Sequence, residues 1–534
     1  MKTTHWFRSL VLLLGNVASF MLGTTVALAA EDVTLSYGPV ELSVAVASLE
    51  TYVNEGRIDA ELAVYLDFLS DEEQAGLREL LTAPIEVSPS ILSRALYSDF
   101  GELWLERLGE VIQTDRRQNG FYALRGALVV AAAEPDGLTL LNVMRKFPTP
   151  TLRIRSGAIL QVVNHVVTLV EQTETAIAAL KQQSAREIAA ATPIDIAPLP
   201  DITQAGSVGW QVETWELDDA ERDRTLVVDF YLPQTQTPAP LVVISHGFGA
   251  SRVNFADMAQ HLASHGFAVA ALEHPGSNQR QIQNLFQGTA SDVLAPNEFV
   301  NRPRDISYIL DRLEAEGRTN ASWASQIDLT RIGAVGHSFG GYTALALAAG
   351  GFNVEGLEAS CSSDLGELGS VNISLSLQCL ALNGDMEQSL RDERIDAVFV
   401  FNPTVALVLG QQELGQVQTP TFMVSGSDDP IAPAAIEQIQ PFTWLTTPDK
   451  YLALIEGGSH NYEQSDTVPP ELSGLDPTLS RQYLKALSLA FMQVHVAGQP
   501  DYGQFLQAGY GQQLSQEPLP LTLVKNLPSA SPGP

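Results

Sequence analysis

Short apolar segments rich in β-branched residues alternate with helical stretches along the chain from about residue 208 onward. This pattern is typical of a mostly parallel sheet with helices on both faces, so we predict an α/β fold for residues 208–497. The segment 241–245 is almost wholly apolar, as expected of a strand that is buried on both faces. The other expected strands are residues 225–231, 267–272, 332–335, 397–401, 421–424 and 451–455. The expected helices are residues 255–264, 304–314, 342–349 and 480–494.

The sequence GHSFGG at positions 336–341 lies between an expected strand and an expected helix. It fits the pattern G-x-S-x-G, in which a serine occupies a sharp turn from strand to helix. The residues two before and two after the serine must lack side chains, because strand and helix approach each other closely there. The N-terminus of the following helix also favours negative charge beside the serine. We therefore predict that Ser338 is a nucleophile.

A serine nucleophile needs a histidine base, and the histidine needs a carboxylate to orient it. In folds with this turn the partners follow the serine in the order acid, then histidine. His460 lies in a glycine-rich loop after the strand 451–455, whereas His495, the other histidine after Ser338, lies at a helix end. We therefore predict that His460 is the base.

Two neighbouring carboxylates, Asp428 and Asp429, follow the strand 421–424. We predict that Asp429 is the acid because it directly precedes the sequence PIAP at 430–433. Turn chemistry alone explains Asp428, which we expect to cap the turn. Ser338, Asp429 and His460 then form the predicted catalytic triad.

Acyl transfer also needs two backbone N–H groups to stabilise the developing oxyanion. We predict that Phe339 provides one, because it follows the nucleophile. Phe248 provides the other, in the loop after the strand 241–245, where glycines flank it. His246 lies in the same loop but precedes the nucleophile in the chain, so we expect it to form hydrogen bonds within the loop. This chemistry requires no cofactor and no metal.

Residues 240–252, 262–274 and 336–341 together closely resemble the platelet-activating-factor acetylhydrolase family. The regions around Asp429 and His460 also look similar to dienelactone-hydrolase-like proteins. The resemblance covers roughly residues 208–496. It implies an α/β-hydrolase fold and a serine carboxylic-ester hydrolase that forms an acyl-enzyme and acts on lipid or short-acyl esters.

One position departs from the pattern of the animal lipid-hydrolysing members of that family. Their acid lies at the end of the strand that follows the nucleophile helix, but here that strand ends in FVFNP at 399–403, without a carboxylate. Asp396 lies at the beginning of the strand, at the wrong edge of the sheet for catalysis. We therefore keep Asp429 as the expected acid.

The triad does not decide the acyl donor, so a thioesterase, a polyester hydrolase and a peptidase remain alternatives. A non-catalytic binding protein on a hydrolase scaffold is a further alternative, as is a partner-binding role for the N-terminal region. Residues 351–393 and 280–303 are longer than plain connections and are candidates for a lid over an apolar acyl pocket. The longer candidate contains Cys361 and Cys379, which can form a disulfide in an oxidising compartment or remain as two thiols.

The first 29 residues have the pattern of a secretory signal peptide. Lys2 and Arg8 precede an apolar run, and Ala27-Leu28-Ala29 offers a cleavage site. We therefore expect an exported protein, periplasmic or secreted, without a stable membrane span after cleavage. An uncleaved segment that anchors the chain in a membrane is the alternative.

Residues 30–192 have helical periodicity and predict a separate all-α domain before the hydrolase. Ser70 to Glu73 form a capping box, and a long apolar stripe begins near Ser156. The region looks like the uncharacterised domain that precedes such hydrolases in some bacterial exported proteins. A proline-containing linker, 193–207, follows it. Residues 498–534 form the expected C-terminal tail, and we expect its part from Ser515 to be proline-rich and loose.

Acidic residues outnumber basic residues by 62 to 30, which gives a formal net charge of −32. This charge argues against nucleic acid or an anionic membrane surface as a partner. A small-molecule or lipid ester remains the expected partner, and the oligomeric state is left open.

Overall fold

The computed structural model describes residues 29–37, 40–67, 69–192, 200–319, 326–362, 372–461 and 477–527. The chain divides into two compact units. One comprises Met1–Ser93 and Leu105–Ile159, and the other comprises Arg94–Trp104 and Leu160–Pro534. Residues 1–28 of the expected signal peptide and residues 193–199 of the expected linker lie outside the described residues. None of the helices within the described ranges is long and apolar enough to cross a bilayer.

The first unit contains a four-stranded sheet, so the prediction of an all-α domain is wrong. The strands have the order β2 (Val40–Ala45), β1 (Asp32–Tyr37), β4 (Thr151–Arg155) and β3 (Ile112–Gln113). β1 pairs with β2 antiparallel and with β4 parallel. Because β1 and β4 are far apart in sequence, no local periodicity indicates their pairing.

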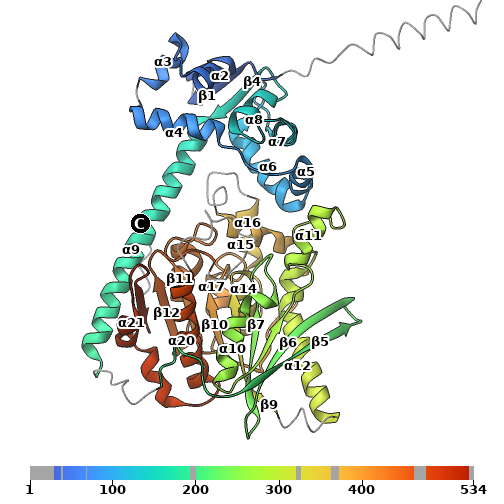
Figure 1. The fold of residues 1–534 in the computed structure, drawn as a ribbon, viewed down its shortest axis with the longest axis vertical. Coiled ribbons are helices and arrows are strands. Elements are labelled where there is room, and N and C mark those ends of the chain that lie inside the picture. The colour runs from blue at the N-terminus through green and yellow to red at the C-terminus, as the bar shows by residue number, and fades with distance from the viewer. Residues whose placement is uncertain are drawn as a thin grey trace, which may run out of the picture. The chain divides into compact units, whose positions relative to one another are not determined.

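Helices nevertheless make up most of residues 30–192 (Figure 1). The capping box at Ser70 is confirmed, since its side chain accepts from the Glu73 N–H while the Glu73 side chain accepts from the Ser70 N–H. The helices of residues 46–190 are α2 (Val46–Glu55), α3 (Ala60–Leu66), α4 (Asp71–Thr82), α5 (Pro89–Leu96), α6 (Asp99–Val111), α7 (Phe121–Ala132), α8 (Leu140–Lys146) and α9 (Ser156–Ala190).

The second unit is built on a nine-stranded, mostly parallel sheet, as the alternating pattern predicts. Its strands have the order β13-β12-β11-β10-β9-β7-β8-β6-β5, and only the pairs β5–β6, β6–β8 and β12–β13 are antiparallel. The strand bounds are β5 Trp210–Asp219, β6 Arg224–Pro233, β7 Ala239–Ser245, β8 Ala268–Leu272, β9 Ile327–His337, β10 Ile395–Phe401, β11 Thr421–Gly426, β12 Lys450–Ile455 and β13 Leu521–Val524.

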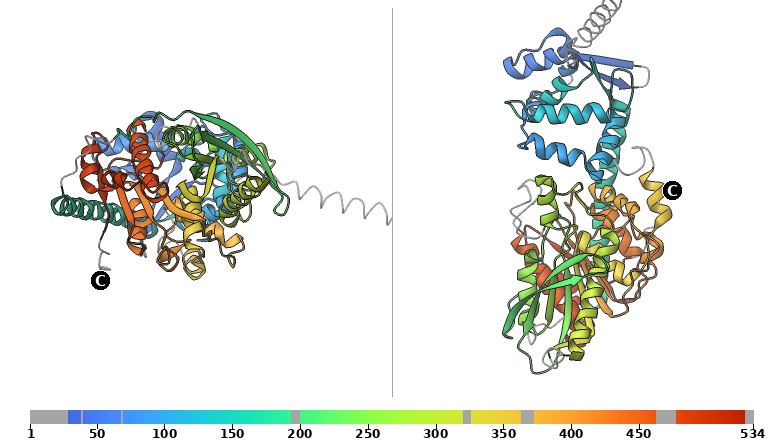
Figure 2. Two further views of the ribbon diagram at one scale, coloured as in Figure 1. Left: turned by 90° about the horizontal axis from the view of Figure 1, so that it is seen from below. Right: turned by 90° about the vertical axis from the view of Figure 1, so that its right-hand side faces the viewer.

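Helices cover both faces of this sheet (Figure 2). Alternate residues of β7 enter different cores: Leu241 packs with α12 and α14, whereas Val242 packs with α10 and α20. Both side chains are fully buried, which explains the continuous apolar run of this strand. The helices around the sheet are α10 (Ala256–Ser264), α11 (Gln279–Gln287), α12 (Glu298–Thr319), α14 (Phe339–Ala349), α15 (Val354–Cys361), α16 (Ile373–Cys379), α17 (Gly410–Leu414), α18 (Gln440–Trp444), α20 (Thr478–His495) and α21 (Ala508–Leu514).

The carboxyl ends of the central strands meet at one edge of the sheet. Ser245 of β7 is in register with Gly336 of β9, and Phe401 of β10 is in register with both His337 and Val424. The loops that leave these strands therefore begin side by side, where open α/β sheets bind their ligands.

The prediction of a loose tail from Ser515 is wrong for its described part, which ends at residue 527. A short 3₁₀ helix, Pro500–Leu506, leads into α21, and β13 pairs antiparallel with β12. The side chain of Leu523 is fully buried in the core that also contains α20. Burial of this apolar strand outweighs the effect of the prolines that precede it.

Candidate active site

Ser338 lies on the turn between β9 and α14, with a backbone φ of 52°. Such a φ is unfavourable for a side chain with a Cβ and persists only where the surroundings enforce it. A Cβ on Gly336 would lie 2.0 Å from the Gly340 carbonyl oxygen, and a Cβ on Gly340 would lie 2.0 Å from the Ser245 carbonyl oxygen. The two glycines of the motif are therefore required by the close approach of strand, helix and neighbouring loop.

The structure brings the three predicted triad residues together in a hydrogen-bonded series. His460 Nδ1 lies 2.7 Å from Asp429 Oδ2, and His460 Nε2 lies 2.9 Å from Ser338 Oγ. Because a carboxylate only accepts, Nδ1–H donates to Asp429, and Nε2 is free to accept the Ser338 hydroxyl proton. All three side chains are buried.

The backbone after Asp429 fixes the orientation of its carboxylate. Its Oδ1 accepts hydrogen bonds from the N–H groups of Ile431 and Ala432, at 2.8 and 2.7 Å, which leaves Oδ2 for His460. The neighbouring Asp428 is exposed, and its carboxylate accepts from the Ser427 hydroxyl. The two carboxylates, although adjacent in sequence, therefore bond different partners: Asp429 bonds His460 and Asp428 bonds the Ser427 hydroxyl.

Asn402 contacts the loops of both expected partners of the serine, a role that the sequence analysis missed. Its amide Nδ2 donates to the carbonyl oxygens of Ser459 and His460, at 3.0 and 3.1 Å, and its Oδ1 accepts from the Gly426 N–H at 2.9 Å. The sequence showed only that this strand end lacks a carboxylate. A carboxylate could not donate to the two carbonyl groups, so the amide suits this position.

The two residues predicted to supply oxyanion donors lie on segments adjacent to Ser338. Phe339 begins α14, directly after the serine. Phe248 follows Gly247, and a Cβ on Gly247 would lie only 3.5 Å from the Ser338 Cβ. The loop after β7 therefore passes directly against the serine.

The other candidates from the sequence lie outside the hydrogen-bonded series. Burial lowers the pKa of His246 well below its ordinary value, and its Nε2 accepts from the His274 backbone N–H at 3.0 Å. His495 lies near the end of α20, 3.4 Å from the Tyr451 hydroxyl. Asp396 accepts from the Ile332 N–H at the beginning of β10, the opposite edge of the sheet.

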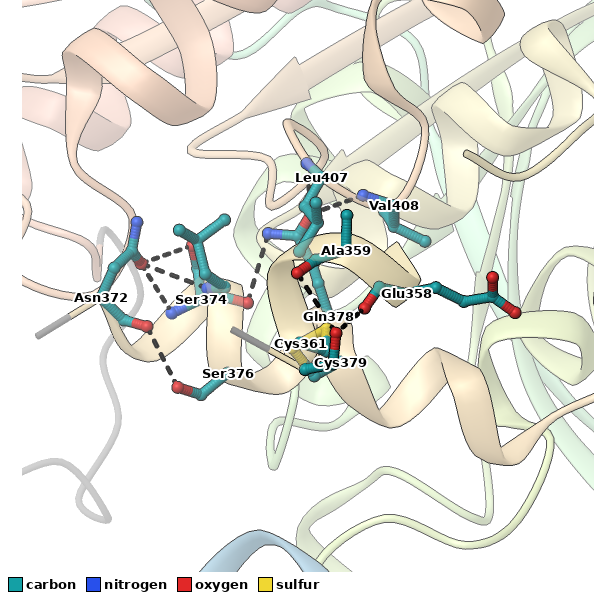
Figure 3. Close-up of a disulfide and its surroundings, with 12 residues drawn as sticks. Glu358, Ala359, Cys361, Asn372, Ser374, Ser376, Gln378, Cys379, Leu407 and Val408 are labelled. Atoms are coloured by element: carbon teal, nitrogen blue, oxygen red, sulfur yellow. Dashed lines mark hydrogen bonds between the residues drawn. A yellow bond between two sulfur atoms is a disulfide. The ribbon is translucent and has the colours of Figure 1, made fainter. Parts of the chain in front are cut away.

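Part of the first lid candidate, residues 351–393, is joined to the rest of the second unit through a buried carboxylate. Glu437 accepts four hydrogen bonds, from the Ser374 hydroxyl, the Gln378 amide and the N–H groups of Val405 and Ala406. Gln378 Oε1 in turn accepts from the N–H groups of Leu407 and Val408 (Figure 3). These bonds connect α16 to the loop after β10.

A disulfide joins Cys361 at the end of α15 to Cys379 at the end of α16 (Figure 3). The residues between the two helices, 363–371, lie outside the described part of the chain. The second lid candidate, 280–303, includes most of α11 and the beginning of α12. Across the described ranges, no group of three or more histidine, cysteine or acidic side chains is arranged to hold a metal ion.

Comparisons with known proteins support this assignment of fold. Residues 29–155 match the family described as "Alpha/beta hydrolase of unknown function (DUF1400)", and residues 230–289 match "Platelet-activating factor acetylhydrolase, isoform II". The platelet-activating factor acetylhydrolases of Bos taurus and Canis lupus familiaris are each 28% identical to the chain. The bovine alignment covers 20% of this chain and 31% of the relative, and the canine alignment covers 22% and 36%.

The chain spans about a third of the length of these curated relatives. The second matched family segment, 230–289, includes β7, β8 and the loop that carries Phe248. Together with the mostly parallel sheet and the serine turn, these matches show that the chain has an α/β-hydrolase fold and resembles the platelet-activating factor acetylhydrolases.

Proposed function

We propose that this protein is a serine carboxylic-ester hydrolase that works through an acyl-enzyme. The observation that carries the proposal is the series of hydrogen bonds from Ser338 Oγ through His460 to Asp429. This arrangement allows a weak serine nucleophile to react at neutral pH, because a base accepts its proton while a carboxylate stabilises the resulting imidazolium.

In the proposed first step, Ser338 Oγ attacks the ester carbonyl carbon and its proton passes to His460 Nε2. Asp429 keeps the other imidazole nitrogen protonated, so that Nε2 is available as the base. The backbone N–H groups of Phe248 and Phe339 stabilise the oxyanion of the tetrahedral intermediate. The intermediate collapses when His460 gives its proton to the alcohol oxygen, and the alcohol leaves.

In the second step, His460 accepts a proton from water, and the resulting hydroxide equivalent attacks the acyl carbon of the acylated Ser338. Collapse of the second tetrahedral intermediate breaks the bond to Oγ. His460 returns the proton to Oγ, and the carboxylic acid is released. None of these transfers needs a redox partner.

We propose lipid or short-acyl esters as the substrate class. The support is the resemblance to proteins whose printed name is platelet-activating factor acetylhydrolase, together with the apolar residues around the site. Among these residues, Phe248 is only partly buried and packs against the main core. Partly exposed apolar side chains beside a nucleophile suit an acyl chain better than a charged substrate.

The first test is labelling with a fluorophosphonate probe, followed by kinetics on p-nitrophenyl esters of increasing acyl length. We expect labelling and turnover in the wild type and the loss of both in Ser338→Ala. Ser291→Ala, which removes an exposed hydroxyl from the same unit, is the matched control and should behave as wild type. A well-folded wild type that neither labels nor turns over any ester would contradict the proposal and favour a binding protein on this scaffold.

The substrate class is tested by comparing matched p-nitrophenyl esters, acyl thioesters and p-nitroanilides. We expect the highest kcat/KM on oxygen esters. Faster turnover of thioesters or anilides would instead assign a thioesterase or a peptidase with the same triad.

We also propose that the protein acts after export. The disulfide between Cys361 and Cys379 supports this, because such bonds persist in oxidising compartments. Fractionation of cells that express the full chain, with mass measurement of its N-terminus, tests both export and cleavage near residue 29. Retention of the protein in the cytoplasm would contradict the proposal.

A further inference from the structure

Arg302, on α12, is a fully buried side chain whose guanidinium donors point toward the oxyanion loop and the nucleophile helix. Nη2 donates to the Ser245 hydroxyl at 3.2 Å and also to the His246 carbonyl oxygen. Nη1 donates to the Ser277 hydroxyl at 2.8 Å, and Nε donates to the Thr343 hydroxyl at 3.0 Å. The planar fork of an arginine can make all these bonds at once.

Arg302 also reaches Phe339, the residue that follows the nucleophile. Its guanidinium carbon lies 4.5 Å from the centroid of the Phe339 ring, a cation–π contact. The Thr343 hydroxyl that accepts from Arg302 donates to the Phe339 carbonyl oxygen at 2.9 Å. One side chain therefore contacts the segments of both proposed oxyanion donors.

The contact with His246 bears on where the Phe248 N–H points. Arg302 holds the His246 carbonyl, and the His246 ring donates from Nδ1–H to the Gly247 carbonyl oxygen at 2.7 Å. The His246 tautomer follows from its surroundings, since Nε2 accepts from the His274 N–H. In a planar trans peptide the N–H points away from the carbonyl oxygen, so fixing the Gly247 carbonyl fixes the direction of the Phe248 N–H.

Burying a guanidinium is costly, and burial lowers the pKa of Arg302 to about 9. Two buried carboxylates, Glu298 and Asp305, bond groups that lie beside the Arg302 guanidinium. Glu298 accepts from the Ser277 hydroxyl at 2.8 Å, and Asp305 accepts from His274 Nδ1–H at 2.9 Å. The chain therefore maintains a cation in its interior at the back of the oxyanion loop.

We propose that Arg302 is a positioning residue for the oxyanion hole, which fixes the Phe248 and Phe339 backbone N–H groups relative to Ser338. This inference rests on the proposed serine-hydrolase function. It assigns to Arg302 no contact with substrate and no part in proton transfer. Its effect is confined to stabilisation of the oxyanion, which forms only in the transition states and the tetrahedral intermediates.

The test compares Arg302→Lys with Arg394→Lys in the full chain. Arg394 is matched because it also pairs with α12, through Asp311 and Glu314, but it bonds Asp392 near the beginning of β10 rather than the oxyanion loop. Lysine keeps a donor nitrogen at the end of a long side chain but cannot reproduce the planar fork. For each variant, kcat and KM on a p-nitrophenyl ester, inhibition by phenylboronic acid and the melting temperature are measured.

We expect kcat of Arg302→Lys to fall by about 10- to 100-fold with KM nearly unchanged, because misplacing oxyanion donors affects the transition state alone. Affinity for phenylboronic acid, which forms a tetrahedral adduct on the serine, should fall in parallel. Arg394→Lys should retain both values even if its melting temperature drops. Unchanged kcat and boronate affinity in Arg302→Lys, or an equal loss in Arg394→Lys, would overturn the inference.

Thr343→Val is the second variant, and it decides the matter if Arg302→Lys does not fold. Valine keeps the shape of threonine but removes the hydroxyl between Arg302 and the Phe339 carbonyl. We expect a smaller loss in kcat and in boronate affinity, of about 3- to 10-fold, and an effect on neither would overturn the inference. These outcomes presuppose turnover that depends on Ser338. A wild type without such turnover overturns the proposed function itself, whereas an active wild type matched by Arg302→Lys overturns only the role of Arg302.

Discussion

Two loops flank Ser338, and each is supported by a buried charged side chain of opposite sign. On the oxyanion side, Arg302 donates to hydroxyl groups and to the His246 carbonyl. On the acid side, Glu437 lies in the short helix Ala435–Ile439, which follows the Asp429 loop. Its carboxylate accepts from two backbone N–H groups of the loop after β10, and from a hydroxyl and an amide group of α16. Both charged side chains are fully buried.

The difference in sign follows from the backbone groups that each side must hold. The oxyanion loop directs carbonyl groups inward so that its N–H groups can face a substrate, and inward carbonyls need a donor. The loop after β10 directs the N–H groups of Val405 and Ala406 inward, and these need an acceptor. A buried ion is costly, but an unsatisfied buried backbone group is costly as well, and the ion satisfies several such groups at once.

The largest expected effect concerns the acid side itself. Asp429→Asn should lower kcat/KM by about 10⁴-fold, because an amide no longer holds His460 in the tautomer that leaves Nε2 unprotonated. Asp428→Asn is the matched control one residue away, and its kcat/KM should stay within about twofold of wild type, since exposed side chains outside the site rarely matter. Ester kinetics on both variants measure the contrast. Equal losses in the two variants would show that the loop, rather than one carboxylate, carries the effect.

The next effect tests whether the acid side needs an anion as the oxyanion side needs a cation. Glu437→Gln should lower the free energy of unfolding by about 2 kcal/mol, because the new amide group turns donors toward donors. Denaturant titration measures this value, and Glu413→Gln, at a half-buried position of α17, is the control. A Glu437→Gln variant as stable as wild type would show that the acid side does not need a buried anion at this position.

The difference in unfolding free energy between wild type and Glu437→Gln should also depend on pH. Burial raises the pKa of Glu437 in the folded state above its ordinary value. Between the unfolded and the folded pKa, the native protein binds more protons than the unfolded chain, so this group's contribution to stability decreases as pH rises through the folded pKa. The difference in unfolding free energy between wild type and Glu437→Gln should therefore be largest at acidic pH and shrink toward neutrality. A difference that grows with pH would contradict the assigned direction.

The smallest expected effect lies at the opposite edge of the sheet. Asp396→Asn should leave kcat/KM within about twofold of wild type, because Asp396 accepts from the Ile332 N–H at the beginning of β10, away from the triad. Ester kinetics and a melting curve measure the result. A large loss of activity with unchanged stability would show that the functional edge of the sheet has been assigned wrongly.

The residues that could be predicted from sequence are those with a local pattern or a fixed order in the chain. Ser338 stands in a glycine-flanked turn, and His460 and Asp429 each follow a recognisable apolar strand. The supporting residues have no such pattern. Arg302 stands in the sequence NRPR, and Glu437 lies in a short helix without a motif. Their burial depends on segments, distant in sequence, that meet only in the folded chain.

The same limit explains the two errors in the fold. β1 pairs with the neighbouring β2 but also with β4, far along the chain, so part of what stabilises this sheet comes from a partner that no local window of sequence contains. β13 was missed because Pro518 and Pro520 precede it, and prolines argue against a strand in local terms. Both errors concern strands whose pairing is decided by tertiary structure.

β13 has a consequence for biosynthesis. It covers the outer edge of β12, the strand that leads to His460, yet it is synthesised after α20 and α21. Until it emerges from the ribosome, β12 presents an open edge with unpaired N–H and C=O groups, which can pair with other nascent or unfolded chains. A chain that ends before residue 521 would retain every proposed catalytic residue and still be prone to aggregate.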